Sequence, residues 1–191
     1  MLQEMKVETL RAAQVNPYLQ HLEQHDNQPC AGRWASEFGP LNQVFTLLDP
    51  PALAAAAQYP ADSSGLAALR PGDLVHRETW PLRAVKAYRP IHDALYELRE
   101  YTLHPGTHGR FVNLMLQSMQ VRERYSPNVA IWVPLAGNPD RVLHLWAYRD
   151  LVHRDEARAG VAQEPAWKTY TEAIVPLLKA MHSTVLRPAK R

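Results

Sequence analysis

The sequence predicts an α+β fold built from two tandem β-α-β-β-α-β halves, each a ferredoxin-like unit. Three observations predict it. Residues 32–53 and 130–151 resemble each other without a gap, so that Trp34 matches Trp132 at an offset of 98. Each of these copies contains a strand, a turn of glycine, proline and asparagine, a second strand and the start of a helix. A strand and a helical pattern precede each copy, and a helical region and a last strand follow it.

The first half is expected to span residues 1–88. Its first strand and helix lie in 6–25, and its hairpin lies in 32–53, where Gly39 and Asn42 mark the turn. The region after the hairpin is rich in alanine and then irregular, and a last strand covers 79–85. A linker around Pro90 then leads to the second half.

The second half is expected to span residues 91–191. A strand at 94–103 is followed by the turn "HPGTHG" and a helix. The apolar residues of that helix recur at helical spacing: Phe111, Leu114, Met115 and Met119. After the hairpin, the helical region 150–181 is expected to break at Pro165, because proline cannot continue a helix. The last strand covers 183–189.

In each half both helices would cover one face of a four-stranded antiparallel sheet and leave the other face bare. We therefore expect the bare faces to pack sheet to sheet within the chain, as an internal pseudo-dimer. Side chains alternate along a strand, so the stretch "DRVLHLWAYRD" presents two rows. The row expected under the helices is Leu143, Leu145 and Ala147. The row expected to face the space between the sheets is Val142, His144, Trp146 and Tyr148.

The interior between the sheets is also expected to receive side chains from strand 94–103. The candidate catalytic residues there are His144, Arg99 and Tyr101. The candidate ligand-binding residues are Trp146, Tyr148, Glu37 and Asn42. An arginine can hold a carboxylate or phenolate through two hydrogen bonds, and a histidine can exchange a proton near neutral pH. The alternative is a polar core whose members satisfy one another's hydrogen bonds.

The first half is chemically plainer than the second. Thr46 and Leu48 occupy the positions that correspond to His144 and Trp146, so the sequence predicts an asymmetric site. Glu37 and Asn42 flank the turn of the first hairpin; a carboxylate there could act as a base, but turns favour such polar residues for backbone reasons alone.

Histidine and cysteine patterns do not predict a metal site. His21 and His25 share one helix face, but two ligands do not make a metal site. His104 and His108 have the same spacing within a turn, which gives them no shared face. Cys30 is the single cysteine, which excludes an intrachain disulfide, and we interpret it as a small packed residue.

Composition excludes several other classes of protein. The 191 residues include 21 basic and 19 acidic side chains, a formal net charge of +2 that gives no electrostatic footprint for nucleic acid or anionic membrane. We see no signal peptide, membrane span or glycine-rich phosphate loop, so we expect a cytoplasmic protein without a cofactor. Self-association as a homo-oligomer is expected because symmetric dimers are the commonest soluble oligomers.

Three stretches of the chain resemble the NIPSNAP family, which belongs to the dimeric α/β-barrel superfamily. They are "YELREYTLHPG" from Tyr96, "GPLNQV" from Gly39 and "HLWAYRDLVHR" from His144 to Arg154. The resemblance covers nearly the whole chain and implies the barrel fold. The second half departs from the pattern where it has "GNPDRV" in place of "GPLNQV", which supports an asymmetric site.

The resemblance implies no single chemistry. Small monooxygenases share the fold, whereas animal members of the family have been linked to vesicular or mitochondrial roles. Two hypotheses follow. In one, the protein binds a small molecule in the cavity between the sheets and acts as a cofactor-independent oxygenase, isomerase or lyase. The alternative is a non-catalytic interaction or scaffold protein.

Overall fold

The computed structural model describes residues 1–25, 30–49, 69–70 and 72–189. The chain divides into two compact units, Met1–Arg83 with Thr184–Arg191 and Ala84–Ser183. The division falls inside two long strands, so each of these strands contributes residues to both units. None of the helices in the described ranges is long and apolar enough to cross a membrane.

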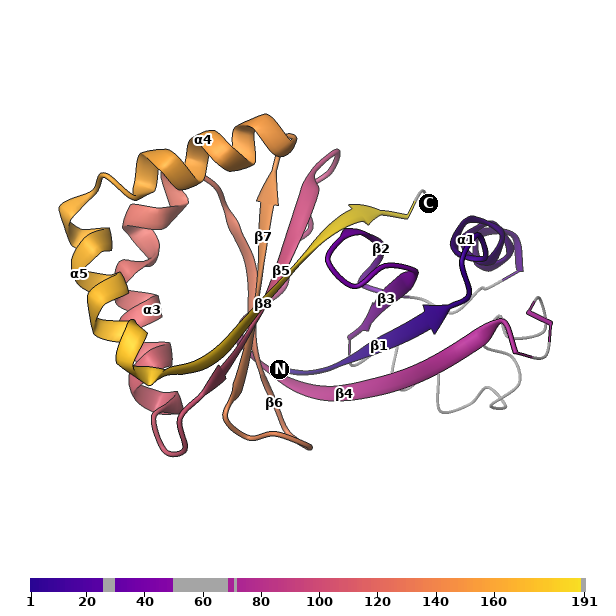
Figure 1. Cartoon of the computed structure of the whole chain (residues 1–191), viewed down its shortest axis with the longest axis horizontal. Coiled ribbons are helices and arrows are strands. Elements are labelled where there is room, and N and C mark those ends of the chain that lie inside the picture. The colour runs from indigo at the N-terminus through magenta and orange to yellow at the C-terminus, as the bar shows by residue number, and fades with distance from the viewer. Residues whose placement is uncertain (26–29, 50–68, 71, 190–191) are drawn as a thin grey trace. The chain divides into compact units, whose positions relative to one another are not determined.

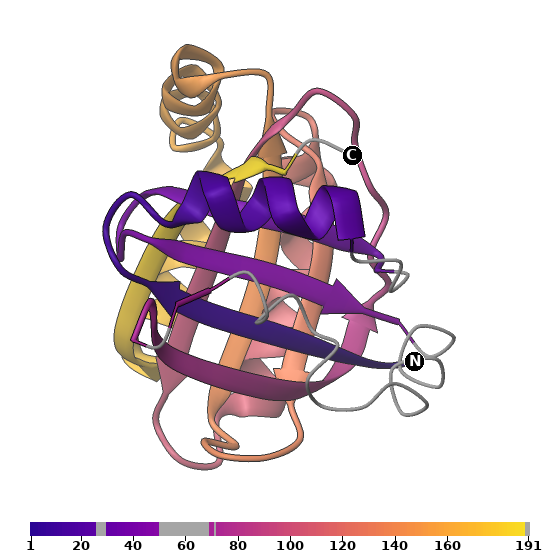
Figure 2. The same cartoon turned by 90° about the vertical axis from the view of Figure 1, so that its right-hand side faces the viewer.

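The first unit contains one described helix and an antiparallel sheet. Its elements are β1 (Leu2–Leu10), α1 (Val15–His25), β2 (Gly32–Phe38), β3 (Gln43–Leu48), most of β4 (Leu74–Lys86) and the end of β8 (Leu178–Pro188). The strands lie in the order β4-β1-β3-β2-β8. Figure 2 views this unit from the side of α1, whose Tyr18 and Leu22 pack against Leu10 and Val44 of the sheet. One face of this sheet is therefore covered by α1.

The predicted elements of the first half agree with these bounds where the structure describes them. The strand and helix expected in 6–25 and the hairpin expected in 32–53 are confirmed. Strand β4 is longer than expected, because it begins at Leu74 and not near residue 79. The helical region predicted after the hairpin falls largely on 50–68, outside the described residues.

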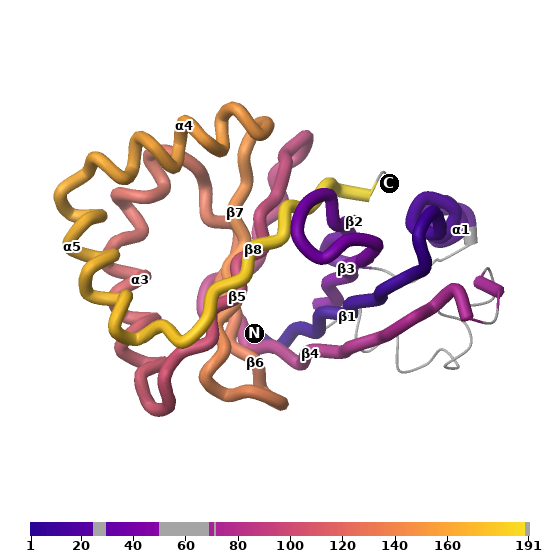
Figure 3. Tube along the Cα trace, viewed as in Figure 1, coloured from indigo at the N-terminus to yellow at the C-terminus, as the bar shows by residue number. Residues whose placement is uncertain are grey.

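The second unit contains three α-helices in its described residues. Its elements are β5 (Leu95–Leu103), α3 (His108–Glu123), β6 (Asn128–Pro134), β7 (Arg141–Tyr148), α4 (Leu151–Val161), α5 (Pro165–Ile174), a 3-10 helix η3 (Val175–Leu177) and the start of β8. The strand order is β8-β5-β7-β6-β4. Figure 1 shows α3, α4 and α5 together on one face of this sheet, and Figure 3 follows the chain from β7 through α4 and α5 into β8.

Prolines set the ends of the last helices. The predicted break at Pro165 is confirmed, because α4 ends at Val161 and Pro165 opens α5, where its missing N–H costs nothing. The predicted extension of the helical region to residue 181 is wrong. Pro176 has no N–H with which to continue the hydrogen bonding of α5, so the chain passes through η3 and becomes extended from Leu178.

The two rows of β7 face opposite to our expectation. Trp146 and Tyr148 belong to the same buried cluster as Phe111 and Met115 of α3 and Ile174 of α5. The row of Val142, His144, Trp146 and Tyr148 therefore lies under the helices. The row of Leu143, Leu145 and Ala147 is equally buried, on the other face of the sheet. Alternation separates the two rows but does not tell which of them the helices cover. The expectation that the helices cover the aliphatic row was wrong.

Candidate functional site

The predicted polar-aromatic residues of the second half do come together. In the register of β5 and β7, Arg99 lies directly opposite His144, and Tyr101 lies opposite Val142. The rings of Tyr101 and His144 have centroids 4.7 Å apart, and Arg99 Cζ lies 5.4 Å from the centroid of the Tyr101 ring. Their location differs from the prediction: they lie in the layer between the second unit's sheet and its helices, and not on the opposite face.

A short hydrogen bond orients the imidazole of His144. Trp146 Nε1 donates to His144 Nδ1 at 2.6 Å, and both side chains are buried. Burial, reinforced by the guanidinium groups of Arg99 and Arg122, holds the pKa of His144 well below its ordinary value of 6.5. The ring is therefore neutral at pH 7. Because Nδ1 accepts a hydrogen bond, the proton of the neutral ring is on Nε2.

Two nitrogen atoms in this layer are buried without a hydrogen-bond partner in the described part of the chain. They are Arg99 Nε of β5 and His144 Nε2 of β7; a third such nitrogen, His108 Nε2, belongs to the first residue of α3. We call Arg99 Nε and His144 Nε2 the donor pair, because each carries a proton. Their residues are cross-strand neighbours, whose Cβ atoms lie about 5 Å apart. A buried donor without an acceptor costs about 1–3 kcal/mol, so the donor pair suits an oxygen acceptor.

A second set of polar groups surrounds Glu97, two residues before Arg99 on β5. The Glu97 side chain is fully buried and accepts hydrogen bonds from Arg154, at 2.9 and 3.2 Å, and from the Tyr148 hydroxyl at 3.2 Å. Arg158 of α4, at 3.4 Å, and the Ser183 hydroxyl also donate to it. We call Glu97 and these donors the Glu97 network.

The charge of Glu97 is stabilised by the Glu97 network. Burial alone would raise the pKa of Glu97, but hydrogen bonds from Arg154 and Ser183, together with the positive charge of Arg99, outweigh it and lower the pKa to about 2. Glu97 is the only buried carboxylate among the described residues of the second unit. The arginines that interact with it or with its neighbours are Arg99, Arg122, Arg154 and Arg158. The layer therefore carries excess positive charge and favours an anion.

Arg122 links the Glu97 network to Trp146. It reaches into the layer from α3, where it is 4% exposed. Its guanidinium donates to the Tyr148 hydroxyl at 2.9 Å and to Ser126 Oγ at 2.6 Å, and its Cζ lies 4.6 Å from the Trp146 ring centroid. The indole that orients His144 is thus held in place by a cation that is itself fixed by two hydrogen bonds.

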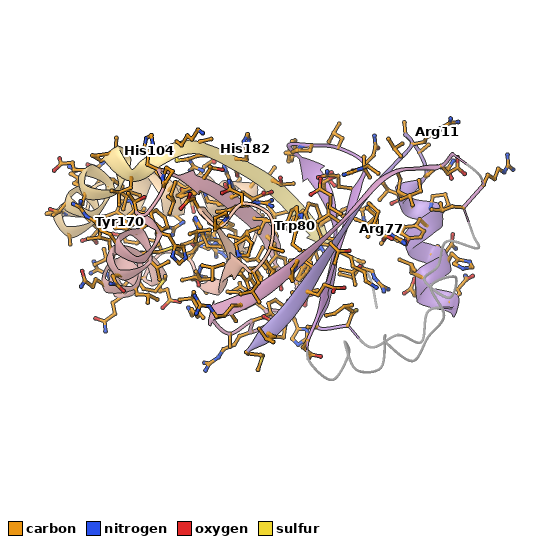
Figure 4. All side chains as sticks on the ribbon, turned by 90° about the horizontal axis from the view of Figure 1, so that it is seen from below. Arg11, Arg77, Trp80, His104, Tyr170 and His182 are labelled. Carbon is orange, nitrogen blue, oxygen red and sulfur yellow. The ribbon has the colours of Figure 1, made fainter. Side chains whose placement is uncertain are left out.

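Sequence reasoning did not assign roles to Glu97, Arg122 or Arg154. Signals for them were present: Glu97 shares a strand face with Arg99, and Arg154 belongs to the stretch that resembles the family. Arg122 lies three residues after Met119, on the apolar stripe of its helix, where a charged residue requires buried partners. Tyr170 of α5, labelled in Figure 4, adds another buried phenol to the layer, and burial raises its pKa above the usual range.

Glu37 and Asn42, the other predicted ligand-binding residues, belong to the first unit. Glu37 forms an ion pair with Arg187 at 3.3 Å, and both side chains are well exposed. Asn42 has a φ of 59°, which asparagine tolerates better than most residues, and its carbonyl accepts a hydrogen bond from the Leu10 N–H. Turn geometry accounts for Asn42, and the contacts of these residues give no sign of a ligand.

A separate hollow, open to solvent, lies in the second unit. It is bounded by residues 91–94 and by Pro127, Ala147, Tyr148, Arg149 and His153. Tyr148 is four residues from His144 along β7, or roughly 13 Å at the usual rise of a strand. The hollow is therefore not the environment of the donor pair. In the described ranges no group of three histidine, cysteine, aspartate or glutamate side chains could hold a metal ion.

Comparisons with known proteins agree with the resemblance seen in the sequence. The family model NIPSNAP matches residues 96–191. Human NipSnap homolog 2 is 33% identical over 96 residues, which cover 50% of this chain and only 34% of the human protein. The NipSnap homolog of Dictyostelium discoideum is 21% identical over 194 residues, covering 98% of this chain and 87% of that protein.

Among solved structures, a proposed monooxygenase from Lactobacillus acidophilus has a similar fold. Its TM-score is 0.71 with 15% sequence identity, and the match covers 99% of this chain and 94% of that one. At this identity the similarity shows the fold alone.

Proposed function

Because the chain belongs to the NIPSNAP family, we propose that its second unit, which lies almost entirely within the matched segment, binds a small molecule between the sheet and the helices. The observation that carries the proposal is the donor pair. Buried polar groups in folded proteins nearly always have partners, and a buried donor without one calls for an explanation such as a ligand. Two such donors on neighbouring strands point to one ligand atom or group.

The chemistry that the donor pair supports is stabilisation of negative charge on an oxygen atom. A charged guanidinium and the N–H of a neutral imidazole are fixed donors in a layer without bulk water, where electrostatic stabilisation is strongest. Oxygenation, isomerisation and carbon–carbon cleavage without a cofactor can all pass through such an oxyanion. We therefore keep the cofactor-independent oxygenase, isomerase and lyase as the enzymatic forms of the proposal. The oxygenase corresponds to the proposed monooxygenase with the same fold.

Duplication of one β-α-β-β-α-β ancestor, with halves at 1–88 and 91–191, remains part of the proposal. The sheet registers support it: Lys6 of β1 pairs with Thr46 of β3 as Arg99 of β5 pairs with His144 of β7. The stretches "EMKVETL" from Glu4 and "ELREYTL" from Glu97 are then identical at three of seven positions and share a positive charge at a fourth. In this frame the first unit keeps a cation at the position of Arg99 but has no imidazole.

The first unit's buried carboxylate supports placing the site in the second unit. Glu8 receives hydrogen bonds from the Tyr18 hydroxyl at 2.8 Å and from Arg77 Nε at 3.0 Å (Arg77 is labelled in Figure 4). Arg33 Nε donates to Thr46 Oγ1 at 3.3 Å. These groups satisfy one another, as expected of a structural polar core.

A paired substitution tests the proposal. We expect His144→Ala to abolish retention of a small molecule by the purified protein, measured by native mass spectrometry, and Thr46→Ala, the matched change in the first unit, to leave it intact. His144→Ala should cost about 1–3 kcal/mol of stability at most. Loss of stability with unchanged ligand retention would make His144 a core residue. Absence of any bound molecule together with recovery of a stable protein partner would favour the scaffold alternative.

A further inference from the structure

The bond between Trp146 and His144 has a direction that cannot be reversed. An indole N–H is only a donor, so His144 Nδ1 can only accept. A protonated imidazole would place two N–H groups against each other, and the opposite tautomer would do the same. The bond therefore selects one of the three forms of the ring, the neutral form with its proton on Nε2, and this is the nitrogen that has no partner among the described residues.

The indole is itself fixed in its orientation. Arg122 lies against the Trp146 ring at 4.6 Å, and the Tyr148 hydroxyl accepts from Arg122 at 2.9 Å while donating to Glu97 at 3.2 Å. These four side chains lie on β5, β7 or α3, and all four are buried. Rotation of the indole would therefore disturb several linked contacts at once, from His144 to Glu97.

The ligand that matches this arrangement must bring an acceptor and gains from bringing negative charge. An amine or amide N–H placed at the donor pair would meet two other donors. A neutral carbonyl would satisfy them but would not use the excess positive charge around Glu97. A carboxylate, phenolate or enolate oxygen satisfies both conditions.

We propose that the site takes a small molecule with an anionic oxygen, bound by Arg99 Nε and His144 Nε2, and that Trp146 is the positioning residue that fixes the tautomer of His144. This inference rests on the proposed function, because it names the class of ligand for the same site. In the free protein, before any ligand binds, His144 should already have its proton on Nε2.

The tautomer is measured on the full chain labelled with ¹⁵N at histidine, from the two-bond proton–nitrogen correlations of the ring. We expect His144 to show a single form with Nε2 protonated. In Trp146→Phe, which lacks the indole N–H, the His144 signals should move toward a mixture of the two neutral tautomers. Trp167→Phe is the matched control, because that indole also lies near Arg122, at 5.9 Å, but does not bond to His144.

The spectrum of the wild-type protein tests the tautomer even if Trp146→Phe does not fold. Nδ1 protonation or an imidazolium at His144 in the wild-type protein at pH 7 would overturn it. So would an unchanged single tautomer in folded Trp146→Phe. His153 provides an internal reference, because its Nδ1 accepts from the Arg149 backbone N–H at 3.1 Å, which favours the same tautomer.

The ligand class is tested in the same samples with matched acids and amides, from acetate and acetamide to benzoate and benzamide. We expect at least one carboxylate to shift the His144 Nε2 signal and to bind tenfold or more tightly than its amide, and Arg99→Gln to abolish the difference. Equal binding of acid and amide, or a bound molecule without an acidic oxygen in native mass spectrometry, would overturn the ligand class and leave the proposed function standing. No response to any acid and no bound molecule would overturn both.

Discussion

Glu97→Gln should destabilise the protein strongly at neutral pH and much less in acid. The substitution keeps the shape of the side chain but removes its charge. Arg154 and Arg158 would then face a neutral amide, whose NH₂ group cannot accept a hydrogen bond from them. A charge left unpaired in a buried network is one of the larger effects that a single substitution can have.

The magnitude follows from the pKa of Glu97. The folded value of about 2 lies below the ordinary value of 4.5. A tenfold change in proton affinity corresponds to about 1.4 kcal/mol, so the ionised carboxylate contributes about 3 kcal/mol to folding. Because the pKa is depressed in the folded protein, this contribution is present above pH 4.5. It is lost as the pH falls from 4.5 toward 2, where the carboxylate of the folded protein takes up its proton.

Urea unfolding of the wild-type protein and of Glu97→Gln at pH 7, 5 and 3 measures the effect. We expect a difference of about 3 kcal/mol at pH 7 that narrows clearly by pH 3. Glu100→Gln is the control on the same strand, because Glu100 pairs with Arg141 and is only partly buried; it should cost about 1 kcal/mol or less. A Glu97→Gln difference that is the same at pH 3 as at pH 7 would refute the assignment of the stabilisation to the charge.

Two further substitutions test the helices of the second unit by thermal or urea unfolding. Gly160→Ala should destabilise by about 1–3 kcal/mol, because a Cβ at Gly160 would lie 2.6 Å from Tyr125 Cε1, whereas Gly109→Ala, with nothing within 4 Å, should be neutral or gain up to about 1 kcal/mol. Equal effects at both glycines would contradict the close contact. Asp150→Ala should cost about 1 kcal/mol, because the Asp150 carboxylate caps α4 by accepting from the His153 N–H at 2.7 Å; unchanged stability would show that the cap contributes nothing.

Local patterns predicted the elements because strand alternation, helical periodicity and proline act over a few residues. Pro165 is an example, since its missing N–H makes it a helix start wherever the rest of the chain lies. The hairpin of β6 and β7 is another. Pairing of Arg99 with His144 was also within reach, because both residues lie near the middle of strands that the repeat placed side by side.

The sequence could not predict which row of β7 the helices cover, because that depends on contacts between distant segments of the chain. The row with His144 and Trp146 and the row with Leu143 and Leu145 are both buried, so hydrophobicity could not choose between them. The helix-covered row is the polar one because α3 and α4 bring arginines to it. The charged side chains of Arg122 and Glu97 can be buried only when polar partners lie near them, and the tertiary fold is what brings those partners together.

The Glu97 network also bears on the order in which the second unit can fold. Arg154 follows Glu97 by 57 residues and Ser183 follows it by 86, so the carboxylate is synthesised well before these two partners. Closing loops of this length is slow, and until they close the carboxylate remains hydrated. We expect water to leave Glu97 of β5 only when α4 and β8 dock against it. Docking of the helix, docking of the strand and burial of the charge would then occur together in one late folding step.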